Sequence, residues 1–118
     1  MIKFTVQGRP HALKRHRTYK GKSYDPSSED KRIFELHCTH HRPKEPLDFP
    51  LHVYLQFHFD DHKNEPDVDN CIKFVFDALN GVFWKDDKYI YRVTAVKCFE
   101  GNARTEVVIM EAKGAILE

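Results

Sequence analysis

The sequence predicts an α+β fold, a single compact domain with a mixed β-sheet and two main helices. Residues 51–59 alternate apolar and polar side chains, a period of two that is typical of a sheet strand with one dry face. Residues 70–80 change to a helical period. A chain of 118 residues can bury one core but not two, so we expect residues 1–118 to form one domain.

The first half of the chain begins with an alternating segment. Residues 2–7 predict an edge or half-buried strand, and residues 18–24 predict a short hairpin around Gly21. A helix should start at Asp25-Pro26, with proline at its first position, and run to about His41. We expect its inward side to consist of Ile33, Phe34, Leu36 and His37.

The second half should supply the central strand and a buried helix. In residues 51–59 the apolar set points inward, which leaves His52 and His58 exposed or at an interface. The 70–80 helix is apolar at almost every position, and Gly81 ends it. Phe83 and Trp84 should then join the core, before strands at 88–98 and about 105–111. The polar exceptions on the helix form one stripe, which is typical of a helix that faces a site or an interface: Asn70, Lys73, Asp77 and Asn80.

Charge is distributed unevenly along the chain. The first 24 residues contain seven basic and no acidic side chains, whereas the rest carries a net charge of −6, for a total of +1. A basic arm on an acidic body indicates that the arm meets an anion, although a solvated basic loop is the alternative. The residues that we expect to contact DNA phosphates are Lys14, Arg15, Arg17, Lys20 and Lys22.

Several protein classes are disfavoured. No apolar run approaches 18 residues, and the amino terminus lacks a secretory signal, so we expect a cytoplasmic protein without a membrane span. The three cysteines are odd in number and widely spaced, which predicts reduced, mostly buried thiols. His37 and His41 share a helix face but lack a second ligand pair, so zinc is not favoured.

Acidic residues gather around the buried helix. Asp67 and Asp69 would project to the same side if extended, Asp69 or Asn70 would cap the helix, and Lys73 follows one turn later. Two carboxylates 4 Å apart repel by about 4 kcal/mol at an effective dielectric constant near 20. Either the acids, including Asp86 or Asp87, do not cluster, or a cation such as Mg²⁺, with Mn²⁺ as a substitute, lies between them.

Acidic loop residues are most often solvated turn formers, and this alternative applies most directly to Asp60, Asp61 and Glu65. It does not explain why Asp67 and Asp69 adjoin a buried helix that bears an aligned lysine.

The segment PDVDNCIKFVFDALNGVFWKDDKYI resembles the RusA family of Holliday junction resolvases, as do the GRP, basic run and TYKGKSYDP near the amino terminus. The resemblance covers most of the chain. It implies a RusA-like fold, and it implies catalytic roles for Asp67, Asp69, Asp87 and Lys73, with Asp67, Asp69, Asp87 and Asp86 as metal ligands. Asp86 and Asp87 would diverge if extended, so only one contacts the ion directly, and the resemblance favours Asp87. Pro66 and Tyr89 depart from residues common in the family.

The resemblance further implies a magnesium-dependent endonuclease that resolves four-way (Holliday) DNA junctions by paired symmetric nicks in recombination and repair. It implies a homodimer of bacterial or phage origin, since a twofold-symmetric junction matches a C2 dimer. Three alternatives remain open: a non-catalytic DNA-binding module, a metal-dependent hydrolase of small phosphoesters, and a structural or partner-binding domain.

Overall fold

The order of elements is the one that the sequence predicts. A computed structural model describes residues 1–14 and 17–113, with Arg17 described in its backbone alone. The elements are β1 (Ile2–Gln7), β2 (Arg17–Tyr19), β3 (Lys22–Tyr24), α1 (Ser28–Cys38), the 3₁₀ turn η1 (Thr39–His41), β4 (Leu51–His58), α2 (Val68–Leu79), the 3₁₀ turn η2 (Asp87–Tyr89), β5 (Ile90–Cys98) and β6 (Arg104–Glu111).

Four strands form one mixed sheet in the order β1-β6-β4-β5. The pairs β1–β6 and β4–β6 are antiparallel, whereas β4 and β5 are parallel. The parallel pair requires a crossover, and α2 provides it. The mixed sheet, the two helices and the edge position of β1 are therefore confirmed, as is the small β2–β3 hairpin, which forms a separate sheet.

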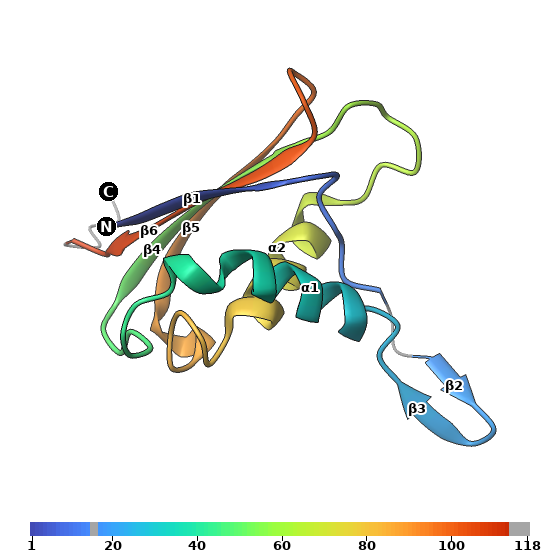
Figure 1. The fold of residues 1–118 in the computed structure, drawn as a ribbon, viewed down its shortest axis with the longest axis horizontal. Helices are drawn as coiled ribbons and strands as arrows, with labels where there is room; N and C mark the ends of the chain where they lie inside the picture. Colours follow the sequence, from blue (N-terminus) through green and yellow to red (C-terminus); the bar gives the residue numbers. More distant parts are fainter. Residues whose placement is uncertain (15–16, 114–118) are drawn as a thin grey trace.

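Both helices lie on one side of the four-stranded sheet, and the hairpin projects away from it (Figure 1). The core lies between the sheet and the helices. The inward side chains of β4 meet the apolar side of α2, and Phe83 and Trp84 complete the core after the helix, as expected. The largest buried residues are Trp84, Phe57, Phe59, Phe74, Phe83, Leu51, Leu55 and Leu79.

The predicted first helix needs correction at both ends and in its inward side. Ser27, not Asp25-Pro26, occupies the position before the helix, and the last residues of the predicted span form η1. Only Phe34 and Cys38 of α1 are buried, whereas Ile33 is 41% and Leu36 is 55% exposed and His37 is also exposed. Phe34 and Cys38 are four residues apart and so lie on one side of α1. This one row is enough to pack the helix, because α1 touches its neighbour α2 over a limited area.

His52 and His58 lie on the expected side of β4 but are buried, with 6% and 7% of their surface exposed. His52 stacks on Tyr54 and contacts the Thr94 hydroxyl at 2.9 Å. His58 contacts the Glu106 carboxylate at 2.9 Å. Neighbouring side chains of β4, β5 and β6 thus contact both rings, although none of the described helices packs on this face.

The cysteine prediction is confirmed. Cys38 and Cys71 are buried, Cys98 is half-buried, and all three are free thiols. Burial raises the pKa of Cys38 to about 12 and that of Cys71 to about 11, so neither is a reactive thiolate at neutral pH. Among the described residues, no helix has the length and hydropathy needed to cross a bilayer.

Truncating Phe57, which is fully buried near the carboxyl end of β4, should strongly destabilise the fold. We expect Phe57→Ala to lower the free energy of unfolding by about 3–5 kcal/mol in urea denaturation, because it removes apolar contacts and leaves a cavity. Val96→Ala, at a position on edge strand β5 that is 45% exposed, is the control and should cost less than about 0.5 kcal/mol. Equal losses would contradict this description of the core.

Candidate active site and nucleic-acid interface

Helix α2 holds the candidate site because its apolar side anchors it in the core. Cys71, Phe74, Val75, Ala78 and Leu79 are buried, which leaves Asp69, Lys73 and Asp77 exposed on the opposite side. The predicted polar stripe is thus present, although the helix starts at Val68 and Asp67 occupies the N-cap position. The expectation that Asp69 or Asn70 caps the helix is wrong, since both lie within its first turn.

Asp67 and Asp69 lie together at the amino end of α2. Within the described part of the chain, the Asp67 carboxylate accepts no capping hydrogen bond, and the Asp67 backbone carbonyl accepts the Cys71 amide instead. Asp69 lies 3.8 Å from the Lys73 ammonium group, and both side chains are exposed. An exposed pair of this kind contributes little to stability, so both groups can bind a ligand at low cost.

Asp87 lies beyond the other end of α2. Its carboxylate accepts a 2.7 Å hydrogen bond from the indole nitrogen of the buried Trp84. Burial raises the pKa of Asp87, the Trp84 hydrogen bond opposes this shift, and the nearby carboxylates of Asp77 and Asp86 add to it. Asp86 turns to a different partner, since it caps η2 by accepting the Lys88 amide at 2.9 Å.

The predicted acids therefore form two groups rather than one. Asp67 and Asp77 are ten residues apart, which is about 15 Å along a helix axis. The Asp87 carboxylate lies near that of Asp77, at the far end of the helix from Asp67. Among residues 1–14 and 17–113, no three His, Cys, Asp or Glu side chains lie close enough together to hold a metal ion. Asp67, Asp69 and Asp87 do not converge beside Lys73 within one chain, because the rigid α2 separates them.

The basic arm is attached to the amino end of α2. The Leu13 amide donates to the Asn70 carbonyl at 3.0 Å, and the Lys14 amide donates to the buried Ser27 hydroxyl at 3.0 Å. Leu13, Lys14, Asn70 and Lys73 line a pocket of about 330 Å³. Two lysines beside a helix amino terminus favour a phosphate group.

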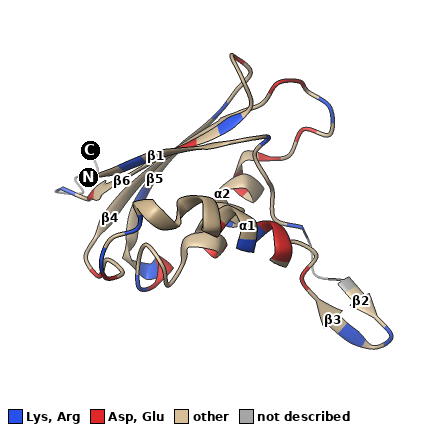
Figure 2. Cartoon of the chain, in the orientation of Figure 1, with Lys and Arg blue, Asp and Glu red and all other residues tan. Residues whose placement is uncertain are grey.

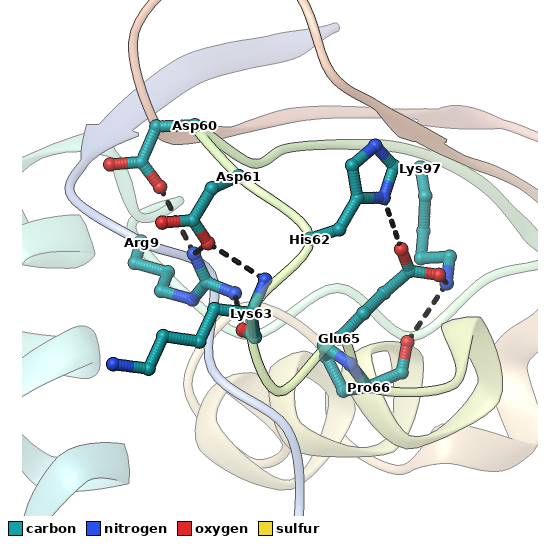
Figure 3. A network of polar contacts seen from close by, with 8 residues as sticks. All are labelled: Arg9, Asp60, Asp61, His62, Lys63, Glu65, Pro66 and Lys97. Atoms are coloured by element: carbon teal, nitrogen blue, oxygen red, sulfur yellow. Dashed lines mark hydrogen bonds and ion pairs between the residues drawn. The ribbon is translucent and has the colours of Figure 1, made fainter.

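The other arm residues differ in their placement. Lys20 and Lys22 lie on the exposed hairpin, whereas Arg15 and the Arg17 side chain lie outside the described residues. Arg9, by contrast, is bound to the loop that follows β4. Its guanidinium group contacts Asp60 and Asp61, each at 3.0 Å, and donates to the Lys63 carbonyl (Figure 3).

Lys97 of β5 fixes the loop that leads into Asp67. Its ammonium group donates to Glu65 at 2.7 Å and to the Pro66 carbonyl at 3.0 Å, and His62 contacts the other Glu65 oxygen (Figure 3). The hydrogen bond from Lys97 is the main reason why the pKa of Glu65 is lowered. Asp60, Asp61 and Glu65 are thus exposed but paired. Sequence reasoning missed Lys97 and Arg9 because their partners are distant in the chain.

Comparison with known proteins gives two findings. A family model described as "Endodeoxyribonuclease RusA" matches residues 4–110, which include the arm, both ends of α2 and η2. The chain is also 30% identical over 136 residues to the "Uncharacterized protein YqaN" of Bacillus subtilis (strain 168), and that alignment covers 93% of this chain and 96% of the relative.

Removing the charge of Asp87 should stabilise the protein in the absence of divalent ions. A raised pKa in the folded state means that the ionised carboxylate opposes folding above that pKa, and that this cost disappears as the pH falls below the ordinary carboxyl range. We expect Asp87→Asn, which keeps an acceptor for Trp84, to raise the melting temperature at pH 7 but not at pH 3. Asp48→Asn, at an exposed position, is the control. A lower melting temperature at pH 7 would show that the Trp84 contact outweighs burial and repulsion.

Lys97→Met should destabilise the loop that positions Asp67. Loss of its hydrogen bonds to Glu65 and to the Pro66 carbonyl should lower the urea concentration at the midpoint of unfolding at pH 7. The pKa of Glu65 is lowered in the folded state, so its pairing stabilises the fold above the ordinary carboxyl pKa and is lost as the pH falls through the lowered value. The difference from wild type, followed by urea denaturation, should therefore shrink in acid. Lys63→Met is the matched control, since the Lys63 side chain points away from this network (Figure 3).

Proposed function

The chain belongs to the RusA family of endodeoxyribonucleases, and from that premise we propose that it resolves four-way (Holliday) DNA junctions by paired symmetric nicks in recombination and repair. The observation that carries the proposal is the pocket shared by Lys14 and Lys73, which adjoins the two acids at the amino end of α2. Phosphate-binding and acidic groups meet there, as hydrolysis of a phosphodiester requires.

DNA would be held through its backbone. Lys14 and Lys73 would contact the phosphate nearest the site, and the amino end of α2 favours the same negative charge. Lys20 and Lys22, together with Arg15 and Arg17 from the sequence prediction, would contact phosphates further along. Such contacts do not read bases, which agrees with selection of a DNA structure rather than a sequence.

Asp67 and Asp69 fit a magnesium ion, with manganese as a substitute. Asp67 has a carboxylate free of capping bonds and Asp69 is exposed, and magnesium is commonly bound by one or two carboxylates together with substrate phosphate oxygens. When bound, the ion supplies the Lewis acid that activates a water and stabilises the leaving 3′-oxygen. Lys73 would neutralise charge on the scissile phosphate, and Trp84 would orient the Asp87 carboxylate.

Asp87 would complete this site from a second copy of the chain. Within one chain, α2 keeps Asp87 with Asp77 and away from Asp67 and Asp69. In a C2 dimer with the exposed side of α2 at the interface, Asp87 of each subunit would approach the amino end of the other α2, and two equivalent sites would result. Two sites related by a twofold axis match the two nicks that a symmetric junction needs.

Asp69→Asn should abolish cutting and keep binding. We expect the rate of nicking on a synthetic four-way junction with Mg²⁺ to fall by at least about 100-fold, because a metal ligand should matter no less than an outer-shell partner. Junction affinity should stay within a few-fold of wild type, and Asp48→Asn should cut normally. Wild-type binding without cutting would favour the non-catalytic module, and cutting of small phosphoesters that does not depend on Lys14 would favour the small-substrate hydrolase.

Mixing two inactive variants tests the shared site. If Asp69 and Asp87 act from different chains, a heterodimer of Asp69→Asn and Asp87→Asn has one site with both substitutions and one intact site. Co-refolded mixtures should therefore regain nicking of one strand, with about half of the dimers active at equal input if the chains pair at random. If each chain holds a whole site, every site in the mixture carries one substitution and no activity returns.

A further inference from the structure

The β2–β3 hairpin is a short, closed projection from the domain (Figure 1). Its strands pair antiparallel, with Thr18 opposite Ser23 and Tyr19 opposite Lys22. The turn residues Lys20 and Gly21 have φ values of 50° and 76°, and positive values at both central positions are typical of the type I′ turns that match the twist of a hairpin. The hairpin therefore has a defined register, and its two faces carry different side chains.

One face of the hairpin is aromatic and basic. Residues that pair across the strands and those two apart on one strand share a face, which places Tyr19, Lys22 and Tyr24 together and Thr18 and Ser23 on the other side. Tyr19 is 66% and Tyr24 is 45% exposed, although tyrosines usually bury most of their ring. Two exposed rings on a hairpin with three-residue strands indicate a surface built for contact rather than for packing.

The charges on this face indicate what it contacts. The hairpin carries lysines and no acidic residue (Figure 2), and the Lys20 ammonium group lies 5.5 Å from the centre of the Tyr19 ring. Aromatic rings that alternate with cations are the arrangement by which proteins bind unpaired bases, with each base stacked on a ring and its phosphates near the cations.

The two ends of the segment that carries the hairpin lie beside the candidate site. Before it, the backbone of Leu13 is bonded to Asn70 of α2, and after it, the Ser27 amide is bonded to the Asp25 carboxylate at 2.9 Å. Ser27 also accepts the Lys14 amide, which joins the two ends of the segment. A strand of DNA at the Lys14–Lys73 pocket can therefore extend towards the hairpin.

We propose that Tyr19 and Tyr24 form a stacking platform for bases exposed at the branch point of the DNA, while Lys20 and Lys22 contact the adjacent phosphates. The proposal rests on the proposed function and assigns the hairpin to structure selection. Bases inside a continuous duplex offer no free face, whereas bases at a branch are more easily unstacked. The tyrosines thus contribute to junction binding alone, and the lysines contribute to junction and duplex alike.

Binding measurements on full-length variants test the platform. The dissociation constant is measured for a four-way junction and for a linear duplex with the sequence of two of its arms. Tyr19→Ala and Tyr24→Ala should each weaken junction binding by about tenfold and leave duplex binding unchanged, because a base–aromatic stack is lost. Lys22→Ala should weaken both and reduce the slope of log affinity against log salt by about one unit.

Three controls separate stacking from damage to the hairpin. Tyr19→Phe keeps the ring and should keep junction affinity. Ser23→Ala, on the opposite face, and Tyr91→Ala, at a tyrosine that is 61% exposed on β5, should keep it too. In addition, 2-aminopurine placed at the branch should change its fluorescence on binding wild type and Tyr19→Phe but not the double alanine variant.

The outcomes distinguish the platform from the proposed function. Wild type that neither prefers nor cuts a junction overturns the proposed function and the platform together. Wild type that cuts junctions, with alanine variants that bind and cut equally well, overturns the platform alone and leaves the tyrosines to a protein partner. Equal losses on junction and duplex also overturn it, since they indicate general loss of the hairpin.

Discussion

Burial of α2 is the constraint on which the rest of the structure depends. Five side chains of this twelve-residue helix are buried against the sheet and α1, so the helix cannot rotate or shift without exposing them. Its polar side chains are thereby held at set positions along its length. Asp67, Asp69 and Lys73 lie at one end, and Asp77 with its neighbour Asp87 lies at the other. Any chemistry that needs both ends has to bring in a second molecule or a substrate.

The cationic side chains around the candidate site fall into two sets, one bound to the loop before Asp67 and one lining the pocket. Arg9 and Lys97 are bound to the loop before Asp67 and stabilise it, whereas Lys14 and Lys73 face an open pocket beside the acids. The committed cations hold a cluster of acidic residues that would otherwise repel one another. Lys14 and Lys73, the latter in only an exposed contact with Asp69, are therefore available for a phosphate backbone, as are the hairpin lysines. The same division applies to the acids, since Asp86 caps η2 and Asp67 has no capping bond.

Stability and the proposed function oppose one another at Asp87. Its carboxylate is half-buried, its pKa is raised by burial and by the charges of Asp77 and Asp86, and one hydrogen bond from Trp84 offsets part of that cost. Structural needs alone would favour a neutral residue at this position. A carboxylate with a perturbed pKa in such surroundings is typical of functional sites, although ion pairs that serve structure alone can perturb a pKa too.

Local pattern in the sequence was enough for the order of elements, the hairpin at Gly21, the dry side of β4, the polar stripe of α2 and the family, because each depends on neighbours within a few residues. The inward side of α1, the burial of His52 and His58, the pairing of Arg9 and Lys97 and the separation of Asp87 from Asp69 depend on contacts between distant segments. Periodicity states which residues share a face, but only packing decides what that face meets. The sequence thus predicted a group of site acids, and the length of the buried α2 decided that one chain does not gather them.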